Sequence, residues 1–344
     1  MMTLFFYFIY LFFSKNKVLS KARNLNSEYS EITITINGPC EVSLINILDP
    51  FPNKVIINEI DVSGLIPSDL KYDFQEEDVY TIILQYDSLF TTCANMFRNN
   101  DYITKIDLSK FDSSKVTDTS GMFYKCGSLK ELNLQNFNTS SVTTMHQMFL
   151  GCPSMTSFDL SSFDTSNVVD MSSLFIYDTG ITSIDLSNFN TSSVKDMSFM
   201  FMSCTNLKSL NLSNINTQSL ENMSAMFRSC SSLTSIDLSS FNTSKVTEMA
   251  NLFHECESLT NINLGDFDTS NISSMKYMFY KCYKLTSLDI SNFNLSKIER
   301  IAYMFQYCEN LEYIKFNNST SLNSIIEANY LFYGCQKLES LDLS

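Results

Sequence analysis

The chain has 344 residues, of which 44% are hydrophobic, and its formal net charge is −14. This composition supplies enough apolar side chains for a large core. The negative charge argues against a nucleic-acid-binding protein, which needs a basic surface, and against attachment to anionic membrane surfaces.

Residues 1–22 contain a run of apolar residues at positions 4–13. The run is too short for a transmembrane helix, which needs about 20 residues, but it is typical of the apolar region of a signal peptide. Ser20 and Ala22 are small residues that suit cleavage after Ala22. Because Lys15 and Lys17 follow the run and no basic residue precedes it, an uncleaved signal anchor is the alternative. Either form predicts a secreted or cell-surface protein.

Residues 27–90 predict a β-rich N-terminal cap. Positions 31–36 alternate apolar and polar residues and are followed by the turn signal Asn37-Gly38. Further strands are expected within residues 41–48, 54–58 and 79–84. We expect these strands to cover the exposed apolar end of the first repeat in the segment that follows.

Residues 91–344 repeat with a fixed period. A phenylalanine recurs every 26 residues, with one last step of 27, at Phe97, Phe123, Phe149, Phe175, Phe201, Phe227, Phe253, Phe279, Phe305 and Phe332. We call these residues the anchor phenylalanines. A fixed period of this length predicts a solenoid in which each repeat packs on its neighbours.

Two shorter periods lie within each repeat. Residues 132–134 alternate inward and outward positions, which predicts a short strand. Val142, Met145, Met148 and Phe149 are spaced as one face of a short helix, and the Asn/Asp-Thr-Ser run between the two segments predicts a turn. The predicted fold is therefore an α/β solenoid, a right-handed coil of about ten repeats with a strand and a helix in each.

The repeat Met-Phe-x-x-Cys-x-x-Leu-x-x-Leu-Asp-Leu-Ser-x-Phe-Asp-Thr-Ser-x-Val-x-x-Met resembles the 26-residue surface-protein repeat of the BspA-like leucine-rich repeat family; residues 239–249 match it closely. The resemblance implies a leucine-rich-repeat-like solenoid on secreted or cell-surface proteins, used for adhesion or other recognition. The chain departs from ordinary leucine-rich repeats at Phe137 and its equivalents, where those repeats have Asn or Cys. An aromatic spine is expected there instead.

A column of cysteines follows the anchor phenylalanines by three residues: Cys126, Cys152, Cys204, Cys230, Cys256, Cys282, Cys308 and Cys335. Zinc sites need Cys or Cys/His pairs at close spacing, which this column lacks. Neighbouring rungs lie within disulfide range, about 5 Å apart, but their side chains would be parallel rather than facing. We interpret the column as small buried side chains. Inter-rung disulfides, a metal site and a Cys40–Cys93 bridge are the alternatives, and no cofactor is expected.

Catalytic groups are scarce. The chain has two histidines, His146 and His254, in different repeats and without a repeated carboxylate or serine companion. It has neither a G-x-S-x-G motif nor a glycine-rich phosphate loop. We therefore expect no enzyme activity.

The outward residues of the predicted strands form the candidate ligand face. One column lies between two inward positions and must face outward: Asp107, Asn133, Asp159, Asp185, Asn211, Asp237, Asn263 and Asp289. Lys105, Glu131 and Tyr313 belong to the flanking column on the same face. The simpler interpretation is that these polar residues only solvate the sheet.

The sequence thus predicts a secreted or cell-surface recognition or adhesion protein that binds a protein or glycan partner through the sheet face. The alternative is a self-assembling surface-coat protein or an intracellular scaffold. The sequence ends just after the strand of a repeat, and self-association is expected at this uncapped C-terminal end.

Overall fold

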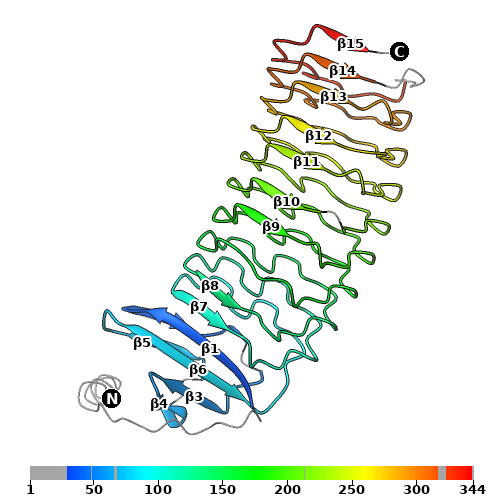
Figure 1. The fold of residues 1–344 in the computed structure, drawn as a ribbon. Helices are drawn as coiled ribbons and strands as arrows, with labels where there is room; N and C mark the ends of the chain where they lie inside the picture. Colours follow the sequence, from blue (N-terminus) through cyan, green and yellow to red (C-terminus); the bar gives the residue numbers. More distant parts are fainter. Residues whose placement is uncertain (1–28, 48, 66–67, 213, 317–322, 343–344) are drawn as a thin grey trace.

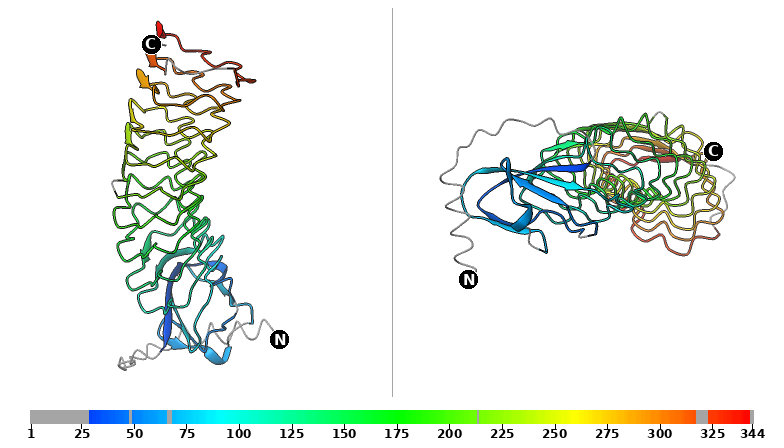
Figure 2. Two further views of the ribbon diagram at one scale, coloured as in Figure 1. Left: turned by 90° about the vertical axis from the view of Figure 1, so that its right-hand side faces the viewer. Right: turned by 90° about the horizontal axis from the view of Figure 1, so that it is seen from below.

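The structure, a computed structural model, describes residues 29–344 except 48, 66–67, 213, 317–322 and 343–344. The predicted signal segment, residues 1–22, lies outside these described residues. The chain forms a rod, with the N-terminal strands at one end and the last repeats at the other (Figures 1 and 2).

The N-terminal strands are β1 (Ser30–Asn37), β2 (Cys40–Ser43), β3 (Lys54–Ile57), β4 (Ile60–Asp61), β5 (Lys71–Phe74) and β6 (Val79–Tyr86). The strands of the repeats are β7 (Ile103–Asp107), β8 (Glu131–Asn133), β9 (Ser183–Asp185), β10 (Ser209–Asn211), β11 (Ser235–Asp237), β12 (Asn261–Asn263), β13 (Ser287–Asp289), β14 (Tyr313–Lys315) and β15 (Ser340–Asp342).

β1 joins the N-terminal strands to the repeats. The sheet order is β4-β3-β6-β1-β7-β8, and β1 is antiparallel to both β6 and β7. Ile34 lies opposite Ile82 on one side and Ile106 on the other, and all three are fully buried. β1 therefore covers the edge that the first repeat strand would otherwise expose.

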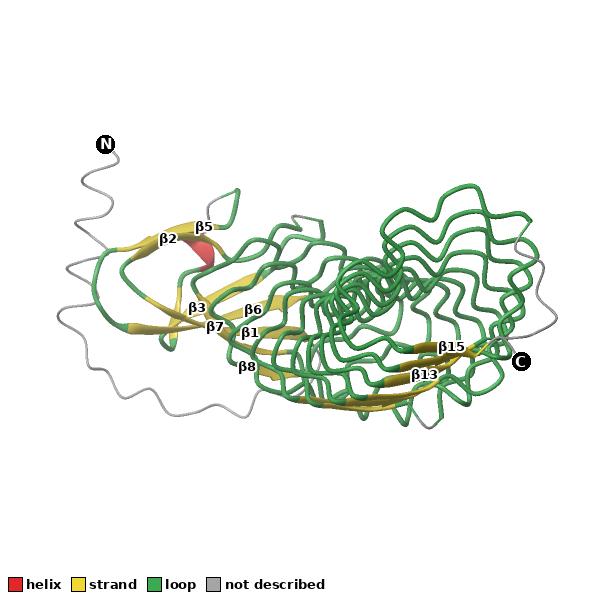
Figure 3. Cartoon of the chain, turned by 90° about the horizontal axis from the view of Figure 1, so that it is seen from above, coloured by secondary structure: helices red, strands yellow, loops and turns green. Residues whose placement is uncertain are grey.

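The repeat strands pair in parallel and in register within the groups β7–β8, β9–β10, β11–β12 and β13–β14–β15, so that a residue lies beside its equivalent 26 positions away, or 27 between β14 and β15. Ile184 pairs with Leu210, and Ile236 pairs with Ile262. The ten anchor phenylalanines bound nine complete turns of this β-solenoid. The strands occupy one face of the coil, and turns and loops form the rest (Figure 3).

The helix predicted in each repeat is absent. Among the described residues the only helix is the short 3-10 helix η1 (Ser63–Leu65). The segment before and after each anchor phenylalanine is a run of β-turns, as in the 3.0 Å bond from the Tyr124 amide to the Gly121 carbonyl. Alternate amides point along the rod instead, as in the 2.8 Å bond from the Phe123 amide to the Met148 carbonyl of the next rung.

Backbone conformation explains why the helix does not form. Gly121 and Lys125 have φ of 59° and 54°, and the positions two before and two after every other anchor also have positive φ. A right-handed helix needs negative φ throughout. Spacings of three residues in a run of β-turns place the same apolar side chains inward as one helical turn would. The fold is therefore a β-solenoid rather than the predicted α/β coil.

Two aromatic columns fill the core. Successive anchor phenylalanines stack with ring centroids 5.5–5.9 Å apart and interplanar angles of 2–15°. Phe137 lies 6.1 Å from Phe111 and 6.3 Å from Phe163 in the second column. The aromatic spine expected at the position of Phe137 is present.

A ladder of hydroxyl groups runs beside the second aromatic column. Each buried hydroxyl donates to the backbone carbonyl of the next rung over 2.9–3.1 Å; the donors are Ser113, Thr139, Thr165, Thr191, Thr217, Thr243 and Thr269. The Thr191 hydroxyl both donates to the Asn216 carbonyl and accepts from the Asn216 amide, each at 2.9 Å. The ladder thus satisfies backbone groups at a bend where no strand pairs them.

Replacing Thr191 by valine should lower the free energy of unfolding by about 1–3 kcal/mol, because the amide and carbonyl of Asn216 lose their partner at a buried site. Urea unfolding followed by circular dichroism measures the loss. Thr191→Ser is the control, since Ser113 holds the equivalent position and keeps the bond. Equal stability of the valine variant and the wild type would refute a structural role for the hydroxyl.

Candidate functional site

The outward column of the predicted ligand face lies where the strands end, except that Asp159 has the equivalent position in a rung without a strand. The Asp185 Oδ1 atom accepts the Ser187 amide at 2.9 Å, and Asp237 Oδ1 accepts the Ser239 amide at the same distance. The same turn forms at Asp107, Asn133, Asp159, Asn263 and Asp289. Hydrogen bonds from the following serine hold the pKa of Asp159 and Asp237 below its usual range. One oxygen of each side chain is thus used to turn the chain at the strand end.

Neighbouring rungs also join these side chains to one another. Asn133 donates to Asp107 over 3.1 Å, and Asn211 donates to Asp185 over 3.1 Å. Lys315 lies 3.1 Å from the Asp289 carboxylate. At these three contacts an amide or a lysine lies beside a carboxylate, whereas Asp159 and Asp185 are carboxylates on adjacent rungs. The column therefore has a structural role in addition to any role in binding.

The flanking column on this face is charged at its N-terminal end and uncharged beyond it. Lys105 Nζ lies 2.7 Å from a Glu131 carboxylate oxygen, and Tyr313, near the other end, is 37% exposed. Small exposed residues lie between them: Ser157, Ser183, Ser209, Ser235, Asn261 and Ser287. The sheet face thus presents hydroxyl and carboxylate groups at a regular spacing, which suits hydrogen bonding to a partner.

The cysteine column lies in the core. Each thiol donates to the backbone carbonyl of the anchor phenylalanine one rung earlier, over 3.0–3.2 Å, at Cys126, Cys152, Cys204, Cys230, Cys256, Cys282, Cys308 and Cys335. All ten cysteines, including Cys40 and Cys93, are free thiols. Burial raises the pKa of the Cys126 and Cys230 thiols to about 12. The thiols are therefore protonated donors rather than nucleophiles.

Asp178 interrupts this column. The carboxyl is fully buried, and its Oδ1 atom accepts the Cys152 amide at 2.6 Å. Its Oδ2 atom has no hydrogen-bond partner among the described residues. Burial raises the pKa of Asp178 well above its usual range. Asp178 thus places a buried carboxyl, with one oxygen lacking a partner in the described part of the chain, where the other rungs of the column have a cysteine thiol.

The two histidines lie four rungs apart and do not form a common site. His146 Nδ1 lies 2.7 Å from the Ser172 hydroxyl. His254 is 8% exposed, and burial lowers its pKa to about 4, so that the ring is neutral at physiological pH. Across the described part of the chain, no group of three or more His, Cys, Asp or Glu side chains is placed to hold a metal ion.

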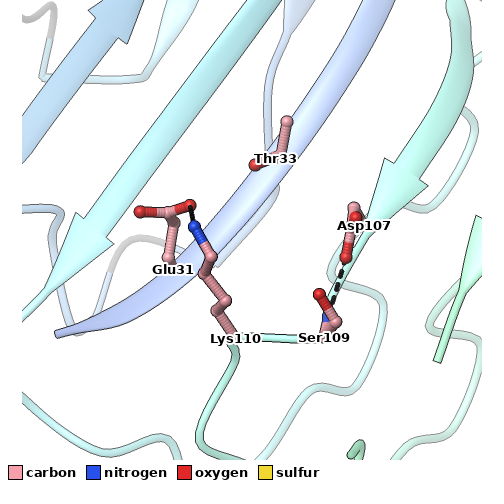
Figure 4. Close-up of a pocket in the computed structure, with 5 residues that line it drawn as sticks. All are labelled: Glu31, Thr33, Asp107, Ser109 and Lys110. Atoms are coloured by element: carbon pink, nitrogen blue, oxygen red, sulfur yellow. Dashed lines mark hydrogen bonds and ion pairs between the residues drawn. The ribbon is translucent and has the colours of Figure 1, made fainter. Parts of the chain in front are cut away.

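A small pocket lies between β1 and the first rung (Figure 4). Lys110 Nζ lies 3.0 Å from Glu31 Oε1, and Gln85 donates to Glu31 Oε2 over 3.0 Å. Asp107 accepts the Ser109 amide beside them. Because both oxygens of Glu31 already have partners within the chain, we assign this pocket to the attachment of β1 to the rung.

Sequence reasoning missed one cluster of partly or fully exposed aromatic side chains. Six tyrosines on the turn segments of the last three rungs lie against one another: Tyr277, Tyr280, Tyr303, Tyr307, Tyr330 and Tyr333. We call them the tyrosine ladder. The signal was present in the sequence, because Tyr277 and Tyr303 are one 26-residue period apart.

Within the described ranges, no helix has the length and apolar character needed to cross a membrane. No curated protein matches the chain. A solved structure of a leucine rich cell surface protein from Faecalibacterium prausnitzii A2-165 is similar, with 17% identity, coverage of 66% of this chain and 76% of that chain, and a TM-score of 0.29.

One family model matches the repeats four times, at residues 91–183, 154–238, 178–282 and 221–343. Its description is "Mycoplasma protein of unknown function, DUF285". The four matches overlap and together span residues 91–343, about three quarters of the chain. The chain therefore belongs to this DUF285 family of repeat proteins, consistent with the BspA-like pattern of its repeat.

Proposed function

We propose that the chain is a secreted or cell-surface recognition protein, with a role in adhesion, that binds a protein or glycan partner through the sheet face. The observation that carries this proposal is the regular row of outward hydroxyl and carboxylate groups on a stacked, hydrogen-bonded frame. The resemblance of the repeat to BspA-like surface-protein repeats and the predicted signal segment support the location.

Binding would rest on many weak contacts rather than on one deep site. The turn bonds hold Asp159, Asp185 and Asp237 in place through Oδ1, and their carboxylates are exposed to a partner. Side chains that are already ordered lose less entropy on binding. The contribution of each rung adds to that of its neighbours along the rod.

The test compares two triple variants that differ only in the face they occupy. Asp159→Asn, Asp185→Asn and Asp237→Asn remove three carboxylates from the sheet face. Each new side chain keeps an oxygen for the turn, as Asn133 and Asn263 do. The matched control carries Asp112→Asn, Asp164→Asn and Asp268→Asn, which have the same turn bonds at another bend of the coil.

Beads coated with each protein, produced in bacteria to avoid glycosylation of the new Asn-x-Ser sites, are tested for attachment to cultured epithelial cells. We expect at least a fivefold loss for the sheet-face variant and no change for the control. Equal attachment by all three proteins would reject the sheet face as the binding surface. Antibody labelling of intact native cells tests the location, and labelling confined to permeabilised cells would contradict it.

Self-association is a second candidate. β15 is an edge strand of its sheet, and Leu341 on it is 41% exposed. Because β1 already pairs with the first repeat strand, β7, stacking of repeat on repeat through β15 would pair two copies rather than build a filament. Light scattering at rising concentration tests this: a mass that levels off at twice the monomer supports pairing, and a constant monomer mass rejects it.

A further inference from the structure

The tyrosine ladder is an ordered aromatic surface. The rings of Tyr277 and Tyr303 stack at 4.7 Å with an interplanar angle of 1°, and those of Tyr303 and Tyr330 stack at 5.4 Å and 14°. The rings of Tyr280, Tyr307 and Tyr333 pack edge-on at 5.5–6.1 Å in a second column. Neighbouring rings hold each other in place, so that little side-chain freedom remains to be lost on binding.

The backbone does not require tyrosine at these positions. Tyr277, Tyr303 and Tyr330 have φ of 58°, 62° and 55°, in the left-handed region. Asn95 and Gly121 occupy the same column in earlier rungs with φ of 59°. Glycine and asparagine enter this region at lower cost than tyrosine does. Every rung has positive φ at this position, so the backbone conformation is common to the coil and the stacked aromatic side chains are what distinguish the ladder.

The hydroxyl groups of the ladder are available to a ligand. Tyr330 and Tyr333 are 56% and 55% exposed, and the other four rings are partly exposed. No group within the described residues hydrogen-bonds to any of the six hydroxyls, and none of them is a buried, unsatisfied atom. At the start of the ladder, Lys281 and Glu255 lie 2.9 Å apart and add a donor and an acceptor.

We propose that the tyrosine ladder binds a linear oligosaccharide. Sugar rings present C–H-rich faces and edges that pack on aromatic rings, and hydroxyl groups that pair with phenol groups. A pyranose ring is about as long as one rung, so successive sugars would meet successive tyrosines. This inference rests on the proposed role of the chain as a recognition protein, but it places the ligand on a surface other than the sheet face.

The size and spacing of the ladder favour a glycan over a protein. A fully buried aromatic side chain covers roughly 150–250 Å², and six partly covered rings offer less than the roughly 800 Å² per partner of a standard protein interface. Side chains on one face of an extended peptide repeat every two residues, at about 6.6 Å. That repeat is longer than the ring spacings of 4.7 and 5.4 Å in the stacked column.

The experiment uses the intact chain and a variant that carries Tyr277→Asn, Tyr303→Asn and Tyr330→Asn. Asparagine suits this backbone conformation, as Asn95 and Asn251 show, and this gain offsets the lost ring contacts, so the variant should fold. Tyr177→Asn is the matched control, because Tyr177 is 51% exposed and has φ of 63° but lies outside the ladder. Circular dichroism verifies the fold of each protein.

An array of linear oligosaccharides built from glucose, N-acetylglucosamine or uronic acids is the probe, and calorimetry on the retained sugars gives Kd. We expect the ladder variant to bind at least tenfold more weakly and Tyr177→Asn to bind as the wild type does. Affinity that falls steeply with salt identifies an acidic glycan, and salt-insensitive affinity identifies a neutral one.

Two results would overturn the proposal: no retention of any sugar by the wild type, or equal retention by the wild type and the ladder variant. The sheet-face variant separates this inference from the proposed function. If the sheet-face variant attaches to cells normally but sugar binding depends on the ladder, the inference stands and the sheet face is rejected. If attachment depends on the sheet face and no sugar binds, the proposed function stands and the inference about the tyrosine ladder is rejected.

Discussion

Replacing Asp178 by cysteine should raise the free energy of unfolding by about 2–3 kcal/mol at pH 7, because the change removes a buried carboxyl with an unpartnered oxygen. The new thiol would restore the column in which Cys152 and Cys204 already donate to the backbone. A cysteine at 178 is expected to donate to the Phe149 carbonyl, by analogy with its neighbours. Urea unfolding under reducing conditions measures the gain.

The gain should depend on pH in a defined direction. Burial raises the pKa of Asp178 in the folded chain above the ordinary value of 3.8, so the folded state holds a proton that the unfolded state releases as pH rises. Wild-type stability is therefore lost progressively as pH rises above 4 toward the folded-state pKa, while a buried thiol stays protonated. The cysteine variant should gain more at pH 7 than at pH 4.5. Asp178→Asn is the control for charge, and a gain independent of pH would contradict this account.

Replacing Phe201 by alanine should lower the free energy of unfolding by about 3–5 kcal/mol, the usual cost of emptying a large core site. Phe201 is fully buried and stacks between Phe175 at 5.6 Å and Phe227 at 5.9 Å. Because each rung is stabilised by its neighbours, the cavity should also uncouple the two halves of the rod. We expect a urea transition at lower concentration that separates into two steps.

Phe199→Ala is the matched control, since Phe199 lies two residues away on the same turn segment but is 38% exposed. Its unfolding free energy should stay within about 0.5 kcal/mol of the wild type. Hydrogen exchange followed by mass spectrometry would locate the opening in the Phe201→Ala variant. If amide protection is lost evenly along the chain, rather than mainly in the rungs from Phe175 to Phe227, coupling between nearest neighbours is contradicted.

The repeat columns made most of this fold predictable. The anchor phenylalanines fix the period, and alternation around Leu132 fixes the strand and the outward direction of Asn133. The strand expected at residues 31–36 lies in β1. These features follow from the spacing of apolar residues. Once the 26-residue period is known, that spacing determines which side chains of neighbouring rungs contact one another.

The predicted helix was wrong because spacing alone does not define backbone conformation. Val142, Met145 and Met148 point inward in a run of β-turns as they would from a helix. Glycine at positions 121 and 151, two before and two after neighbouring anchors, was the signal for positive φ. Most rungs have other residues there, including Ser173 and Phe199, so the signal was diluted.

The candidate site could be predicted only in part. The outward direction of Asp185 and Asp237 followed from alternation, but their turn bonds depend on where each strand ends. The tyrosine ladder was hidden because its side chains lie on the segment that was expected to be helical. The contact between Tyr277 and Tyr280 depends on the turn geometry that replaced that helix.

The axial hydrogen bonds also determine how the rod responds to force. They run along the rod, as in the bonds from Gly121 to His146 and from Phe123 to Met148, so tension applied at the two ends loads successive rungs in series. The weakest rung opens first and leaves the others folded. Each rung then releases 26 residues of chain, a length of roughly 90 Å. Such a rod is a tether that lengthens in equal increments instead of breaking at one load.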